Sequence, residues 1–208
     1  MAIKRSAFKP FTIGRSAFTL AEVVVASSVL LILVGLQLML VQGASSAFHK
    51  TNTQADLLQD IHVTLSRLSR ELQGSTLAGL SLNANGVGLI SAHLAQQNLQ
   101  LNSSGQPFWK QYLLYFRDAP SRELRWRSLP MIAPSDLPVA IEACDFGSGF
   151  HPMSHYQTTG KRLASSVDVF SVSAVGSEIT IHLQASRTRY GSPRPETIEM
   201  RQTVFMRN

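Results

Sequence analysis

The sequence predicts an α+β fold in which a long N-terminal helix, transmembrane in its first half and amphipathic in its second, packs on an antiparallel β-sheet. Two observations carry this prediction. An apolar run over residues 18–41 continues into apolar positions spaced three and four apart as far as residue 72. Beyond it, short segments alternate apolar and polar residues and are separated by Gly, Pro, Asn and Asp. Consecutive strands joined by short turns pair in an antiparallel sheet.

The first half of the helix is expected over residues 18–41, where 24 residues contain a single charge, Glu22. As an α-helix this stretch spans about 36 Å, enough to cross a hydrocarbon core of about 30 Å. Ser27 and Ser28 can donate hydrogen bonds to carbonyls of the preceding turn. The segment therefore has the length and composition of a membrane-spanning helix.

The second half of the helix is expected over residues 42–73, with Gly74 as its C-terminal stop. Its apolar stripe consists of Ala44, Phe48, Thr51, Ala55, Leu58, Ile61, Leu65, Leu68 and Leu72. A coiled-coil stalk would show the same periodicity. Strand-like sequence follows directly, which favours a helix that lies against a sheet. The predicted division of the chain is a leader at 1–17, a transmembrane half at 18–41, an amphipathic half at 42–73 and a β-rich globular domain at 74–208.

The globular part is predicted to consist of hairpins and an irregular excursion. Alternation and turn residues indicate a hairpin of 108–117 with 122–128, in which Leu124 and Trp126 point to one face and Arg125 and Arg127 to the other. A second hairpin and a closing strand follow. The remaining expected segments are short strands at 87–90 and 99–101, an irregular region at 130–160, strands at 167–174 and 178–185, a loop at 187–195 and a strand at 197–207.

Positive charge is concentrated at the N-terminus. Residues 1–17 contain Lys4, Arg5, Lys9 and Arg15 without an acid, whereas the rest of the chain has 15 basic and 13 acidic residues. Basic residues before an apolar segment keep that end on the cytoplasmic side of a membrane. The basic balance therefore indicates membrane topology, and without a Lys/Arg cluster we expect no nucleic-acid partner.

Three kinds of N-terminal segment share this pattern. A secretory signal peptide has an apolar region of 7–15 residues, shorter than the run at 18–41, although small residues near 41–43 or 45–47 offer a cleavage site. An uncleaved signal anchor explains the basic flank. It leaves Glu22 unexplained, because a carboxylate within a membrane is costly unless it is paired or neutralised. The third kind explains both features.

Residues 18–26, FTLAEVVVA, resemble the prepilin processing motif of the type IV pilin-like family: a basic leader, a small residue, then Phe-Thr-Leu-x-Glu and an apolar run. The resemblance implies cleavage by prepilin peptidase between Ala17 and Phe18 and N-methylation of Phe18. Glu22 then becomes the fifth residue of the mature chain. In the family this carboxylate assists subunit assembly by pairing with a neighbour's N-terminal amine. Ala17 stands where the family mostly has Gly, and Gly14 is out of register for this geometry.

The resemblance also implies a function, a location and partners. The order of helix, irregular segment, hairpin, loop, hairpin and strand is similar to minor pseudopilins of the J type of type II secretion systems and to W-type minor pilins. A structural subunit of a pilus or secretion filament is implied, with a single pass through the bacterial inner membrane and the globular domain on the periplasmic side. The implied partners are prepilin peptidase, other pilins or pseudopilins, an inner-membrane assembly platform and membrane lipid. DNA would be added as a partner in an uptake pilus. The alternative is a membrane-anchored exported enzyme or binding domain with an uncleaved anchor.

No residue pattern in the globular part predicts catalysis, so we expect no enzyme activity, no cofactor and no metal. His151 and His155 have the four-residue spacing of a metal pair, but Pro152 and nearby glycines argue against a helix there. Cys144, the single cysteine, lacks a thiol-protease motif around it. Two further groups carry weaker signals. They are Asp136, Glu142 and Asp145, whose spacing fits no known calcium loop, and Trp109, Tyr112, Tyr115 and Trp126, which suit strand packing better than base stacking.

Overall fold

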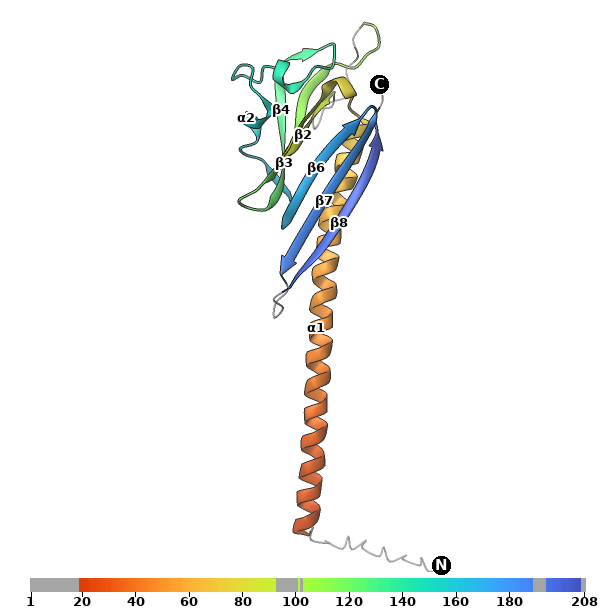
Figure 1. Ribbon diagram of the computed structural model, residues 1–208, viewed down its shortest axis with the longest axis vertical. Helices are drawn as coiled ribbons and strands as arrows, with labels where there is room; N and C mark the ends of the chain where they lie inside the picture. Colours follow the sequence, from red (N-terminus) through yellow and green to blue (C-terminus); the bar gives the residue numbers. More distant parts are fainter. Residues whose placement is uncertain (1–18, 93–100, 102, 189–193, 207–208) are drawn as a thin grey trace, which may run out of the picture. The chain divides into compact units, whose positions relative to one another are not determined.

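The long N-terminal helix continues without a break from the apolar segment into the globular domain. In the computed structural model, which describes residues 19–92, 101, 103–188 and 194–206, helix α1 runs from Leu20 to Gln73 (Figure 1). The chain forms two compact units, residues 1–47 and residues 48–208. Ala17 and Phe18 lie outside the described residues.

Helix α1 ends where the sequence predicts. The Gly74 N–H donates to the Arg70 carbonyl at 3.2 Å and the Ser75 N–H to the Leu72 carbonyl at 3.1 Å, so the last turn is closed by backbone hydrogen bonds. The predicted single helix is confirmed over its described length, with its first residue two positions later than the sequence suggests.

The described strands form two antiparallel sheets. A five-stranded sheet has the order β1-β2-β3-β4-β5, and a three-stranded sheet the order β6-β7-β8. Their bounds are β1 Leu80–Asn83, β2 Gly86–Ser91, β3 Trp109–Asp118, β4 Glu123–Ser135, β5 Lys161–Ala164, β6 Val167–Val175, β7 Glu178–Thr188 and β8 Pro195–Phe205. Short helices lie at Leu77–Gly79 (η1), Ile141–Ala143 (η2) and Met153–Tyr156 (α2).

Both predicted hairpins and the closing strand are confirmed, as β3–β4, β6–β7 and β8. Several details differ. β1 was not predicted, and the short helix α2, which contains His155, lies where Pro152 and the nearby glycines argued against a helix. β4 continues to Ser135, so the irregular region begins six residues later than predicted. β5 was not predicted, because four residues of mixed polarity carry no alternation signal. Of the strand expected at 99–101, Leu101 forms an isolated bridge with Pro107, and residues 99 and 100 lie outside the described residues.

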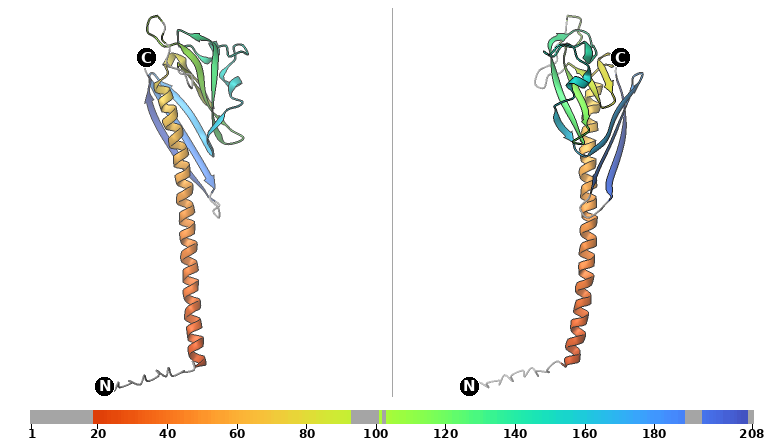
Figure 2. Two further views of the ribbon diagram at one scale, coloured as in Figure 1. Left: turned by 180° about the vertical axis from the view of Figure 1, so that it is seen from behind. Right: turned by 60° about the vertical axis from the view of Figure 1, so that its left-hand side comes forward.

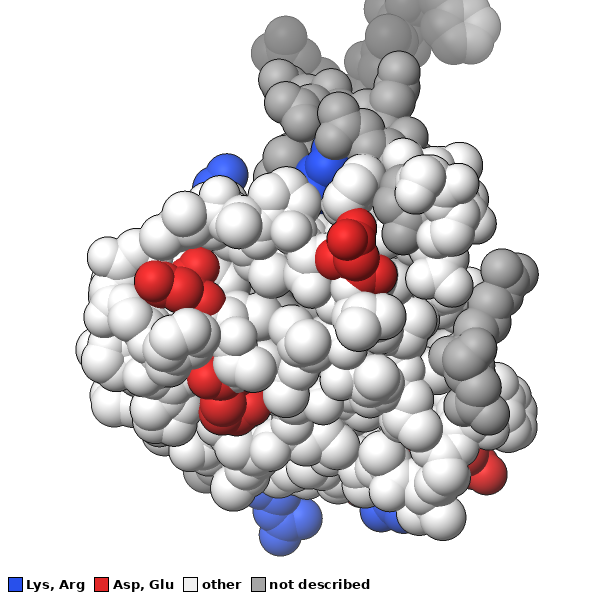
Figure 3. Space-filling view, turned by 90° about the horizontal axis from the view of Figure 1, so that it is seen from above, with Lys and Arg blue, Asp and Glu red and all other residues white. Residues whose placement is uncertain are grey.

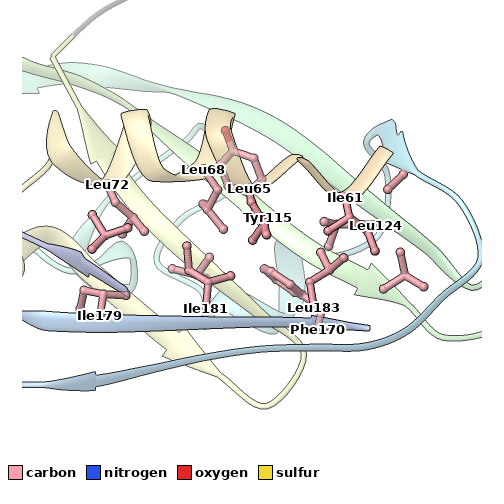
Figure 4. Close-up of a cluster of buried hydrophobic side chains, with 14 of the residues drawn as sticks. Ile61, Leu65, Leu68, Leu72, Tyr115, Leu124, Phe170, Ile179, Ile181 and Leu183 are labelled. Atoms are coloured by element: carbon pink, nitrogen blue, oxygen red, sulfur yellow. The ribbon is translucent and has the colours of Figure 1, made fainter. Parts of the chain in front are cut away.

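A first hydrophobic core joins the second half of α1 to both sheets (Figure 4). Apolar residues of α1 at three- and four-residue spacing point into it, and β7 contributes every second side chain. The members drawn and labelled are Ile61, Leu65, Leu68, Leu72, Tyr115, Leu124, Phe170, Ile179, Ile181 and Leu183. The predicted packing of the amphipathic half on a sheet is therefore confirmed from residue 57 onward. The first part of the predicted stripe is wrong, because Ala44, Phe48, Thr51, Ala55 and Leu58 are exposed and the buried face begins at Leu57.

A second core lies on the other face of the five-stranded sheet. Tyr112, Leu114 and Phe116 of β3 point into it, whereas Leu113 and Tyr115 of the same strand point to the first core. The segment between β4 and β5 covers this face with η2 and α2, through Ile141 and other apolar residues (Figure 2). The irregular region of the sequence is thus a packed layer, which makes β3 buried on both faces.

The two sheets are connected at the β3–β4 turn. The Val167 N–H donates to the Arg122 carbonyl at 2.8 Å, and Arg117 Nε donates to the Val167 carbonyl at 3.0 Å. The Arg122 side chain forms an ion pair with Asp168 and donates to the Ser186 carbonyl at 3.0 Å. Arg122 has a positive φ of 52°, an uncommon backbone conformation that these contacts hold in place.

Candidate functional site

The start of α1 is closed by reciprocal hydrogen bonds between Thr19 and Glu22. Glu22 Oε2 accepts from the Thr19 N–H at 2.9 Å and from Thr19 Oγ1 at 3.1 Å, while the Glu22 N–H donates to Thr19 Oγ1 at 3.3 Å. This is a capping box, in which an N-cap Thr and a Glu three residues later satisfy backbone donors that have no partner within the helix. The carboxylate also lies at the positive end of the helix dipole.

The helix beyond this cap exposes apolar side chains all round. Within the described part of the first unit every residue is exposed except Gly35, which is half-buried. Ser27 Oγ donates to the Val23 carbonyl at 2.7 Å and Ser28 Oγ to the Val24 carbonyl at 2.8 Å, so their polar groups are satisfied within the helix. α1 is long and apolar enough to anchor the chain in a membrane.

Of the residues that the sequence assigns to processing and assembly, the structure places Glu22, at the third position of the helix. Its capping role was not among the predictions from the sequence. The signal is present as Thr-x-x-Glu before an apolar run, which is the usual sequence mark of a capping box. Glu22 therefore has a local structural role independent of any neighbouring subunit.

The histidine pair of the domain is stacked. The rings of His151 and His155 lie with centroids 4.0 Å apart at an interplanar angle of 23°, and His151 Nε2 lies 2.8 Å from the Ser148 carbonyl oxygen. Among the described residues no group of three or more His, Cys, Asp or Glu side chains is arranged to hold a metal. Asp145 Oδ1 instead accepts the N–H groups of Gly147 and Gly149, at 2.8 and 3.0 Å.

Cys144 belongs to the second core. Its side chain is buried, and burial together with the nearby Glu142 carboxylate raises the pKa of the thiol to about 11. A thiol that holds its proton at neutral pH is a weak nucleophile, which accords with a packing role.

Three of the four aromatic residues considered for base stacking are core residues. Trp109, Tyr112 and Tyr115 are buried, and burial raises the pKa of Tyr115 to about 12, with the Arg67 guanidinium acting in the opposite direction. Trp126 is half-buried. The Arg67 Cζ atom lies over its ring, 4.0 Å from the centroid, in a cation–π contact.

Comparisons of the chain with protein-family models, with curated proteins and with solved structures find no match. The capped, apolar start of α1 is the segment whose composition and geometry carry the functional argument.

Proposed function

We propose that this chain is a type IV pilin-like subunit, a minor pilin or pseudopilin of a pilus or type II secretion filament. The observation that carries the proposal is the position of Glu22. It lies at the capped start of an exposed apolar helix, directly after a basic leader whose register fits the prepilin motif. The continuation of this helix into a β-rich domain supports the same class.

The proposed mechanism begins at the membrane. Prepilin peptidase cuts between Ala17 and Phe18 on the cytoplasmic side, and the new Phe18 amine is methylated. The apolar half of α1 keeps the subunit in the bilayer until assembly. In the filament, the Glu22 carboxylate lies near a neighbour's N-terminal amine, so two charges that are costly alone in lipid compensate each other.

The test is intact-mass spectrometry of the chain purified from the membrane fraction. We expect a mass lower than that of the full chain by residues 1–17 and higher by one methyl group. A chain of full mass would assign the protein to the alternative class, a membrane-anchored exported enzyme or binding domain. A mature chain that begins near Ala44 would assign it to proteins with an ordinary secretory signal.

A further inference from the structure

Arg67 and Lys161 form no ion pair with an acidic side chain among the described residues. Arg122, Arg125, Arg162, Arg187 and Arg201 each form an ion pair with a carboxylate. Arg67 and Lys161 instead both face the Trp126 ring. Their positive charge is therefore available to a ligand from outside the chain.

These three residues form a basic–aromatic patch. The Lys161 Nζ atom lies 5.7 Å from the centroid of the Trp126 ring, on the strand that pairs directly with β4. A shallow hollow of about 420 Å³ adjoins the ring and is lined by Trp126, Arg127, Ser128, Thr159, Gly160 and Lys161. The patch thus offers two cations beside an apolar surface, which suits a ligand that combines acidic and apolar side chains.

A second patch has the opposite character. Residues 128–160 include Asp136, Glu142 and Asp145 but contain no Lys or Arg. Asp136 and Glu142 are exposed, and the same segment exposes 66% of Ile132, 65% of Leu137 and 67% of Phe150. We call these five residues the acidic–apolar patch.

The acidic–apolar patch has a groove of its own. The groove has a volume of about 470 Å³ and is lined by Ile132, Ala133, Pro134, Val139, Cys144 and Phe150, among others. Seen from the end of the domain, acidic side chains lie among uncharged residues, and Lys and Arg appear only toward the rim (Figure 3). Large exposed apolar side chains beside a groove are typical of a binding surface.

The two patches adjoin different cores. Trp126 packs against the first core with α1, whereas Val139 and Cys144, which line the groove of the acidic–apolar patch, belong to the second core. The two patches are complementary in charge, and each has apolar surface beside its charged groups. A contact between two different patches is heterologous, so it can repeat from copy to copy without closing.

We propose that the acidic–apolar patch of one copy binds the basic–aromatic patch of a second copy of this chain. The inference rests on the proposed filament function, because an open, repeating contact between parallel subunits is what a filament uses. It specifies the surface by which the globular domains meet.

The test is crosslinking between two full-length, differently tagged copies in the membrane. One copy carries Ala133→Cys beside the acidic–apolar patch, and the other carries Thr159→Cys beside the basic–aromatic patch. Both positions are exposed, whereas the native Cys144 is buried. A short bismaleimide should join the two tags. The control pairs Thr159→Cys with Val175→Cys, an 80% exposed site in the three-stranded sheet, and should give several-fold less product.

A charge swap separates a specific contact from a chance encounter. Asp136→Lys with Glu142→Lys in the Ala133→Cys copy should lower the mixed product about tenfold, because attraction is replaced by repulsion. Arg67→Glu with Lys161→Glu in the other copy should restore it. A chain that had merely lost its fold would not regain the contact through changes in its partner.

Three outcomes would overturn the inference. They are a mixed product no greater than that of the Val175→Cys control, a yield indifferent to the charge changes, and reaction with another protein in place of the second copy. Intact mass reports independently on processing. Cleavage before Phe18 without this crosslink would remove only the proposed surface, and the crosslink without cleavage would remove the proposed function.

Discussion

At the scale of single residues, Glu22 has one observed role and one proposed role, and the two can be separated. Its carboxylate closes a capping box with Thr19, a local contact that stabilises the start of the helix. Its proposed second role is to compensate the amine of a neighbouring subunit. The capping box accepts Glu or Gln, but pairing with an amine requires a charge, so the two roles respond differently to the same substitution.

We expect Glu22→Ala and Glu22→Gln both to leave cleavage and membrane insertion intact, since each makes the apolar segment less polar. Both should reduce crosslinking to partner subunits and the transport or pilus formation that depends on assembly. The Gln variant keeps the cap, so a wild-type level of assembly in Glu22→Gln together with a loss in Glu22→Ala would show that only capping matters. Assembly yield at matched expression is the measurement.

At the scale of elements, the second half of α1 supplies more buried side chains to the first core than any single strand does. Leu57, Ile61, Leu65, Leu68 and Leu72 are all buried, and they follow one another at spacings of four, four, three and four. Between them the helix exposes Val63, 57% accessible, and His62. The helix therefore has one face that cannot accept charge and one that can.

Leu65→Asp should lower the free energy of unfolding of a fragment comprising residues 48–208 by about 3–5 kcal/mol, because an unpaired charge replaces a 2% exposed apolar side chain. Val63→Asp, two residues earlier on the exposed face, should change it by no more than about 0.5 kcal/mol. Urea unfolding measures both. Equal effects of the two substitutions would contradict the packing of this helix against the sheets.

The sequence predicted these elements where a single periodicity dominates. The stripe on α1 and the alternation in β7 arise because one face of each element is buried, and burial on one face leaves a readable pattern. In β3, Tyr112 and Leu113 are buried on opposite faces, so apolar and polar residues do not alternate along this strand. The strand was predicted instead from the length of its apolar segment and from the turn residues that follow it. The packed layer over the second core has no period, and the sequence therefore indicated only irregular structure.

The candidate site was predictable to the extent that its signals are local. Thr19 and Glu22 are three residues apart, and the motif that contains them is continuous in sequence. The contact of Arg67 with Trp126 joins α1 to β4, residues far apart in the chain. Such a contact depends on how the helix crosses the sheet, which composition and spacing do not specify.

At the scale of the whole molecule, the proposed function requires cleavage of the peptide bond between the leader and the mature chain. The proposed prepilin peptidase site requires a small residue before the cut, so Ala17→Gly should be processed at least as well as the wild type. Ala17→Leu should accumulate as the precursor. The ratio of precursor to mature chain in membranes measures this, and normal processing of Ala17→Leu would contradict the prepilin assignment.

The stripe of α1 in the first core also determines how the domain responds to tension. Five buried side chains from Leu57 to Leu72 extend over about 22 Å of helix axis. A force along that axis acts on all five side chains at the same time, because they belong to one continuous helix that can move past the sheets only as a unit. Because the core is close-packed, the helix cannot move along the sheets without breaking these contacts. A force that pulls α1 along its axis is therefore resisted by the five contacts together, and not by one contact after another.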